Sequence, residues 1–255
     1  MTRLIVITSG KGGVGKTTLT SNLAAALTDF GQKVIVMDGN LTTPNLGMHL
    51  GLHLPKKTLH DVLKGDTRLK DAIYPYSYGF DVIPASLSLS DLNEIDPSRL
   101  PEITFSLLGR SDYVIIDSAA GLGREALSAL SSADETIIIT NPNLPAVTDA
   151  LKMITLAKQS NINVLGVVVN RILGRDYEMT KEQIEDLLDA RVISEIPEDK
   201  NIPESISLKT PIIGYKPNSP ASIEIKKLAA ELSGKFYAPP KSRGFWEKFF
   251  ELFKG

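Results

Sequence analysis

The 255-residue chain contains no cysteine, and aromatic residues make up only 6% of it. Without thiols it has no disulfides, no thiolate ligands for zinc or iron–sulfur clusters, and no cysteine nucleophile. It also has no excess of one charge, because 28 Lys and Arg oppose 30 Asp and Glu, giving a formal net charge of −2. The balance does not favour a protein that neutralises nucleic-acid phosphates. We expect a cytoplasmic protein in a reducing compartment.

Long apolar runs are missing as well. The apolar run near the N-terminus, residues 4–7, is too short for the core of a secretory signal, and no cleavage site follows it. No stretch approaches the roughly 20 apolar residues needed to span a bilayer. Any contact with a membrane is therefore expected to be peripheral.

Short apolar runs rich in β-branched residues alternate with amphipathic stretches of helix length. The expected strands are residues 4–8, 34–37, 81–84, 113–116, 136–140, 164–169 and 191–196. The expected helices are residues 17–30, 97–108, 124–132, 146–159, 180–188 and 219–232, and Gly31, Gly109 and Gly234 follow three of them as C-caps. This alternation predicts an α/β fold, a doubly wound and mainly parallel sheet of about seven or eight strands between two helical layers.

One domain, residues 1–237, is expected to hold this sheet, since a chain of this length can form a single core. The composition then changes at residues 238–244, Ala-Pro-Pro-Lys-Ser-Arg-Gly, which we interpret as a linker. Residues 245–254 form a third segment, considered below.

Residues 10–17 read Gly-Lys-Gly-Gly-Val-Gly-Lys-Thr and match the phosphate-loop pattern GxxxxGK[ST] between an expected strand and an expected helix. Glycines let successive backbone N–H groups converge on a phosphate at a helix N-terminus, Lys16 can reach the β- and γ-phosphates, and Thr17 offers a hydroxyl to Mg²⁺. A glycine-rich turn with no ligand is the alternative; a chance match is on the order of 1 in 100 at ordinary glycine frequency. The expected nucleotide-binding residues are Gly12, Gly13, Val14, Gly15, Lys16, Thr17 and Thr18.

Two aspartates, Asp38 and Asp117, each follow an apolar run that is expected to be a strand. In a doubly wound sheet, ligands bind at the carboxyl ends of the strands, so both carboxylates should face the bound phosphates. Each could hold Mg²⁺ through water, and each could instead cap a helix. Together with the phosphate loop they favour a metal site.

Lys11 is a second lysine in the same loop, where a simple phosphate loop needs only one. Its like charge would crowd Lys16 at the phosphates. The alternative is a lysine that is merely solvated.

These residues resemble the MinD/ParA group of deviant Walker A ATPases. The resemblance is carried by residues 11–18, Asp38 and residues 117–121, and weaker pieces at 133–135, 140–142, 166–171 and 196–199 extend it over nearly the whole chain. It implies a SIMIBI-type P-loop NTPase that binds ATP or ADP with Mg²⁺, is monomeric without ATP and forms a face-to-face homodimer with it.

The resemblance also implies roles for single residues. Lys11 would reach across the dimer to the partner's phosphates. Asn170 and Arg171 would contact adenine, although Asn170 at a strand end could equally be a turn residue. The segment around Pro197 would close over the base.

The chain departs from the family pattern at Asn40. The stretch after the second strand usually carries two acids separated by one residue, but here it reads Asp38-Gly39-Asn40. An amide cannot accept a proton, although it can orient water in a reaction that depends mainly on positioning and charge neutralisation. We therefore expect ATP hydrolysis that is present but slow, with Lys11, Lys16, Asp38 and Asn40 as the catalytic set.

Residues 245–254 predict an amphipathic helix whose apolar and charged residues lie on opposite arcs at about 100° per residue. Its apolar residues are Phe245, Trp246, Phe249, Phe250, Leu252 and Phe253. Residues 241–255 carry a charge of +2, which leaves −4 for the rest of the chain. Such a segment suits the surface of an anionic membrane, and a comparable anchor ends one member of the resembled family. The alternative is a helix that docks on its own domain.

The sequence thus predicts an ATPase that associates peripherally with a membrane in its ATP state and acts as a spatial switch. It would place a division site or another cellular structure, with an activator or cargo protein that the sequence does not identify. The alternative is a ParA-like ATPase of DNA segregation, which needs a basic surface; the −4 body makes nucleic acid an improbable partner.

Overall fold

The computed structural model describes residues 1–52, 54–88, 91 and 95–240. Within these ranges one eight-stranded sheet has the order β3-β4-β2-β5-β1-β6-β7-β8. The strands are β1 Arg3–Ser9, β2 Val34–Gly39, β3 Tyr74–Pro75, β4 Asp81–Ile83, β5 Tyr113–Ala120, β6 Glu135–Thr140, β7 Asn163–Ile172 and β8 Val192–Pro197. Every neighbouring pair is parallel except β3 and β4. The predicted doubly wound, mainly parallel sheet is confirmed.

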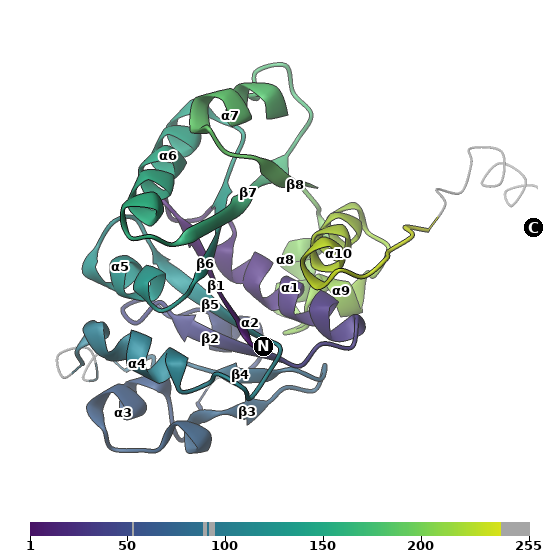
Figure 1. The fold of residues 1–255 in the computed structure, drawn as a ribbon. Helices are drawn as coiled ribbons and strands as arrows, with labels where there is room; N and C mark the ends of the chain where they lie inside the picture. The colour runs from purple at the N-terminus through teal and green to yellow at the C-terminus, as the bar shows by residue number, and fades with distance from the viewer. Residues whose placement is uncertain (53, 89–90, 92–94, 241–255) are drawn as a thin grey trace, which may run out of the picture.

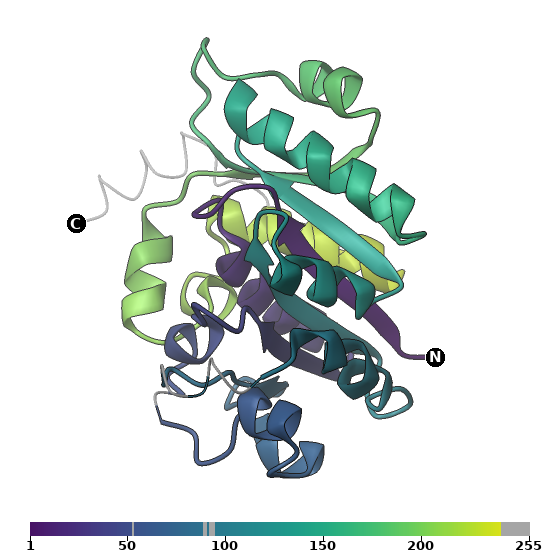
Figure 2. The same ribbon diagram turned by 90° about the vertical axis from the view of Figure 1, so that its left-hand side faces the viewer.

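Helices cover both faces of the sheet (Figure 1, Figure 2). They are α1 Lys16–Asp29, α2 Leu46–His49, α3 Leu59–Lys64, α4 Leu100–Phe105, α5 Arg124–Ser131, α6 Leu144–Gln159, α7 Lys181–Leu188, α8 Asn201–Ser207, α9 Ile212–Tyr215 and α10 Pro220–Ser233. Side chains of α1 and α10 pack on one face, and side chains of α3 to α7 pack on the other. The two faces of β1 divide accordingly, with Ile5 and Ile7 in the first core and Leu4 and Val6 in the second.

The expected helix at residues 97–108 is broken into two short pieces. A 3₁₀ turn at Pro97–Arg99 begins where the Asp96 side chain accepts from the Ser98 amide at 3.0 Å, and α4 follows and ends at Phe105. After α4 the chain tightens, with Leu107 N donating to Thr104 O at 3.0 Å. Pro101, in the first turn of α4, has no N–H to donate to the preceding 3₁₀ turn, so the two pieces do not form one continuous helix.

Gly234 (φ 63°) ends α10 in a left-handed turn, and Tyr237 then packs edge-on against Phe30 at the end of α1, with ring centroids 6.2 Å apart. Residues 235–240 run past α10 without regular structure (Figure 1). The expected linker at 238–244 lies partly outside the described residues, and the expected amphipathic helix at 245–254 lies wholly outside them. In the described part of the chain, no helix has both the length and the apolar composition to cross a membrane.

Candidate functional site

The phosphate loop connects the end of β1 to the start of α1, and its backbone requires glycine at two positions. Gly15 has φ +106°, and a Cβ there would lie 2.3 Å from Asn170 Nδ2. At Gly10, a Cβ would lie 2.2 Å from the carbonyl oxygen of Asp149 on α6. The loop is therefore packed against β7 and α6 as well as turned sharply into α1.

Lys16 lies inside this loop and is only 9% exposed. Its Nζ donates to Ser9 Oγ at 2.9 Å, and Ser9 Oγ donates to the carbonyl oxygen of Lys11 at 2.7 Å. Burial lowers the pKa of Lys16, and the charge of Asp117 opposes that shift. The ammonium is thus held at the centre of the loop, where a phosphate chain would neutralise it.

Asp38 and Asp117 lie side by side on β2 and β5, as partners in the sheet register. Asp38 is 0% and Asp117 1% exposed. Burial raises the pKa of Asp117 to about 6, against the opposing effects of the hydrogen bond from Thr17 and the charge of Lys16. Burial and the neighbouring charge of Asp117 also raise the pKa of Asp38 well above its ordinary value. Two buried carboxylates on neighbouring strands repel each other when both are ionised, and a bound cation would stabilise their ionised forms.

The residues present fit a magnesium ion. Thr17 Oγ1 donates to Asp117 Oδ2 at 2.6 Å, while Asp117 Oδ1 is buried and has no hydrogen-bond partner among the described residues. Mg²⁺ prefers one or two protein oxygens completed by waters and phosphate oxygens. The described ranges contain no group of three or more His, Asp or Glu side chains that could hold a metal ion.

The loop after β2 places Asn40 at this site through bonds within the loop. Asn40 Nδ2 donates to Thr43 O at 2.6 Å, and its Oδ1 accepts from Thr43 Oγ1 at 3.1 Å. The loop is also joined to the start of α5, because the Thr42 hydroxyl and the Thr42 amide (3.1 Å) both donate to the Glu125 carboxylate. Asn40 is therefore held near the phosphate loop.

The three residues expected to contact the base, Asn170, Arg171 and Pro197, lie in different surroundings. Asn170 Nδ2 donates to the carbonyl oxygen of Val14 at 2.7 Å, so part of this amide supports the phosphate loop. Arg171 has a left-handed backbone (φ 59°), and its Nε lies 3.9 Å from Glu198 Oε2. Pro197 is the last residue of β8. The adenine contacts of these residues stay predictions.

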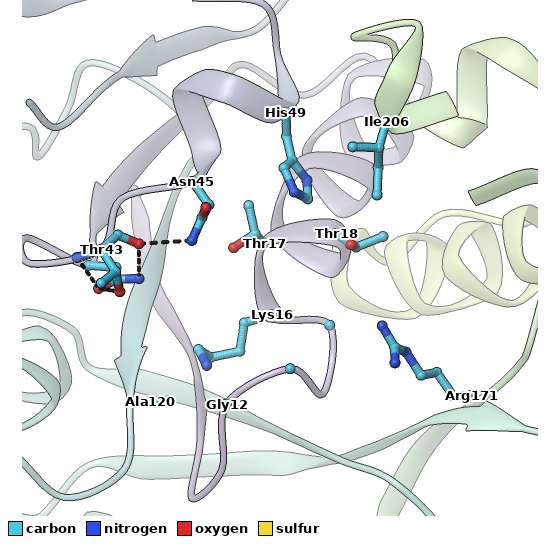
Figure 3. A pocket seen from close by; sticks show the side chains of 13 residues that line it. Gly12, Lys16, Thr17, Thr18, Thr43, Asn45, His49, Ala120, Arg171 and Ile206 are labelled. Atoms are coloured by element: carbon cyan, nitrogen blue, oxygen red, sulfur yellow. Dashed lines mark hydrogen bonds between the residues drawn. The ribbon is translucent and has the colours of Figure 1, made fainter. Parts of the chain in front are cut away.

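A cavity of about 350 Å³ opens above the loop (Figure 3). Its lining includes the predicted residues Gly12, Gly13, Gly15, Lys16, Thr17, Thr18, Asn40 and Arg171. It does not include Lys11, Val14, Asp38, Asp117, Asn170 or Pro197. It also contains residues that the sequence analysis missed, namely Thr43, Asn45, His49, Ala120 and Ile206. No motif marks His49 or Ile206, because both reach the cavity from short helices that periodicity does not reveal.

The first strand of the parallel sheet leads through a phosphate loop into a helix, and two carboxylates on adjacent strands lie beside the threonine of that loop. This arrangement defines a P-loop nucleotide-binding protein. The chain belongs to the CobQ/CobB/MinD/ParA nucleotide binding domain family, whose profile matches residues 5–212.

Similar proteins cover nearly the full chain. An uncharacterized ATP-binding protein of Methanocaldococcus jannaschii is 40% identical over 96% of this chain and 94% of its own length. The septum site-determining protein MinD of Thermotoga maritima is 32% identical over 92% of this chain and 89% of its own. The structure of MinD from Pyrococcus horikoshii OT3, complexed with Mg-ADP, superimposes with a TM-score of 0.88 at 40% identity, covering 91% of this chain and 96% of that one.

Proposed function

We propose that this protein is an ATP hydrolase that uses Mg-ATP to switch between a monomer and a homodimer. The observation that carries the proposal is the grouping of Lys16, Thr17, Asp38 and Asp117 at one phosphate loop. Lys16 would bind the phosphates, and Thr17 would ligate Mg²⁺ directly. Asp38 and Asp117 would bind it through waters, which offsets the cost of burying two like charges. Magnesium would supply charge neutralisation at the phosphates.

The position of Lys11 is a second observation that favours a dimer. Its side chain is exposed beside the loop, outside the cavity lining, and no ion pair joins it to another residue in the described part of the chain. A second subunit facing the first would bring its phosphates to this charge. Lys11 would thus bind in trans, so that ATP itself closes the interface.

Hydrolysis would be slow, because Asn40 cannot take a proton from the attacking water. Its Oδ1 already accepts from the Thr43 amide at 3.3 Å and from the Thr43 hydroxyl at 3.1 Å, and its Nδ2 donates to Thr43 O. One side-chain N–H is therefore left to orient a water molecule. A slow reaction would lengthen the ATP state and leave acceleration to an activator protein.

The output of the switch would be attachment to an anionic membrane through the segment 245–254. An isolated helix shorter than about 12 residues is marginal in water, so one copy should bind weakly. Two copies in one dimer gain roughly 10²- to 10⁴-fold through effective concentration. A cytoplasmic protein would thereby become peripherally membrane-bound with ATP.

The relatives named MinD suggest what is positioned. A septum site-determining relative at 32% identity favours a role in placing the division site or another cellular structure.

Sedimentation velocity with Mg-ATP and with Mg-ADP, beside an assay of phosphate release, tests this proposal. We expect a dimer with Mg-ATP, a monomer with Mg-ADP, and slow release of phosphate. A monomer in both nucleotides, or nucleotide binding that survives Lys16→Ala, would show the proposal to be wrong.

A further inference from the structure

His49, on the four-residue helix α2, is part of the nucleotide cavity although no motif marks it. Its ring points from the wall opposite the phosphate loop toward Thr17 and Thr18 (Figure 3). The ring nitrogen Nδ1 is buried and has no hydrogen-bond partner among the described residues. A buried ring nitrogen without a partner is unfavourable, and such exceptions in a folded protein call for an explanation.

The other described histidine that is buried, His60, behaves differently. Its Nδ1 accepts from the Ser86 amide at 3.1 Å, and its Nε2 lies 3.1 Å from the carbonyl oxygen of Leu41. Both nitrogens of His60 therefore stabilise the fold. Among the described residues no hydrogen bond of this kind holds the His49 ring, and the side chain lines the cavity that a nucleotide would fill.

Helix α2 is nevertheless held firmly above the cavity at both ends. At its start, Leu46 N donates to Asp38 Oδ2 at 3.0 Å, so α2 is positioned by one of the magnesium-binding carboxylates. Just beyond its end, Leu50 is buried in the hydrophobic core that α1, α9 and α10 also form. The ring of His49 is thus presented on an anchored element, in a cavity whose lining also includes Ile206 of α8 (Figure 3).

The ring also lies between the two charged side chains of the cavity. Lys16 occupies the side where the β- and γ-phosphates would lie, Arg171 occupies the side assigned to the base, and His49 lies over Thr17 and Thr18 between them (Figure 3). The part of a nucleotide that bridges phosphates and base is the ribose with its α-phosphate. Both offer oxygen acceptors to an imidazole N–H.

We propose that His49 donates a hydrogen bond to the ribose or α-phosphate oxygens of the bound nucleotide and so fixes its position in the cavity. This inference rests on the nucleotide binding proposed above. It assigns to α2 a direct part in binding, in addition to the phosphate loop.

Calorimetric titration of Mg-ADP into the full-length protein tests the contact, and ADP keeps dimerisation out of the measurement. We expect His49→Leu, which retains apolar volume, to weaken binding about tenfold, the value of one charge-assisted hydrogen bond. His49→Gln, whose amide can replace the ring N–H, should recover most of the affinity. Repeating the titration with 2′-deoxy-ADP distinguishes a ribose contact from an α-phosphate contact.

Two control variants separate this inference from the proposed function. Met48→Ala changes the preceding residue of α2, which is 40% exposed and lies outside the nucleotide cavity, and should bind as the wild type does. Lys16→Ala should lose binding. If Lys16→Ala loses binding while His49→Leu stays within about twofold of the wild type, the His49 contact is wrong and the function stands. If the wild type itself does not bind Mg-ADP, the proposed function fails.

Ring ¹⁵N chemical shifts of the wild type provide a second measurement, in which a variant serves only to assign the signals. The chain has three histidines, so the spectrum is simple, and His49→Leu assigns the signal. Mg-ADP should shift the His49 nitrogens and leave those of His60 in place. Unchanged His49 signals at saturating Mg-ADP would overturn the proposal.

Discussion

At the scale of single residues, Asn40 has the clearest consequence for catalysis. We expect Asn40→Asp to raise the rate of ATP hydrolysis about tenfold or more, because a carboxylate can accept the proton of the attacking water. Phosphate release at saturating Mg-ATP measures the rate, and sedimentation should show the same dimer in both proteins. Asn161→Asp, at an exposed position outside the nucleotide cavity, is a matched control with the same change of charge. An unchanged rate in Asn40→Asp would mean that the amide is not what limits hydrolysis.

His60 predicts a dependence of stability on pH. Burial lowers the pKa of His60 in the folded protein below 6.5, so the neutral ring is favoured. Its stabilisation is therefore fully present above pH 6.5 and is lost as the pH falls through the lower folded value. Urea unfolding of the wild type and His60→Gln across this range isolates the effect, since the buried carboxylates titrate alike in both. Parallel stability curves for the two proteins would refute the prediction.

The residues whose proximity can be predicted from the sequence are those that a strand or the phosphate-loop motif places at the carboxyl edge of the sheet. Lys16, Thr17, Asp38 and Asp117 follow apolar runs or belong to a fixed motif, so their meeting follows from parallel strands. Ser9, which accepts from Lys16, also ends a strand, but it stands just before the phosphate-loop pattern and is not part of it. The hydrogen bond from Asn170 Nδ2 to Val14 O could not be predicted either, because it joins two segments that only the folded sheet brings together.

At the scale of elements, the hydrogen bonds from Thr42 to Glu125 connect the loop after β2 to the helix that follows β5. These are the two strands that carry Asp38 and Asp117. Thr42 belongs to the loop after β2, and Glu125 lies on α5 just beyond the loop after β5. We expect Glu125→Ala to destabilise the first loop locally by about 1 kcal/mol, the value of an ordinary hydrogen bond. Amide hydrogen exchange should then become faster at Thr42. Glu182→Ala, in the exposed first turn of α7, is the control and should leave exchange at Thr42 unchanged. Equal exchange at Thr42 in the wild type, Glu125→Ala and Glu182→Ala would contradict the prediction.

The elements that sequence patterns miss are the shortest ones. Helices α2 and α9 have four residues each and β3 has two, which is too few for a hydrophobic period to register. Their positions come from tertiary contacts, such as the bond from Leu46 N to Asp38. The broken helix at residues 97–108 is a different case, since its apolar spacing is helical and only its prolines indicate the interruption.

At the scale of the whole molecule, the two lysines of the phosphate loop should separate binding from dimerisation. Lys16 is buried in the loop, whereas Lys11 is exposed. Lys16→Ala should abolish binding of ADP and ATP, whereas Lys11→Ala should retain ADP binding and lose the ATP dimer and most hydrolysis. Calorimetry and sedimentation measure the two effects, and an equal loss of nucleotide affinity in both variants would remove the distinction.

The proposed switch couples the nucleotide state of the protein to membrane attachment, and co-sedimentation with anionic liposomes tests this coupling most directly. The wild type should pellet with the vesicles in Mg-ATP and stay largely in the supernatant in Mg-ADP. The double variant Phe249→Glu, Phe250→Glu should remain soluble in both, and a parallel assay should detect no binding to DNA. Equal pelleting of the wild type in ATP and ADP, or pelleting of the double variant in ATP, would contradict the account.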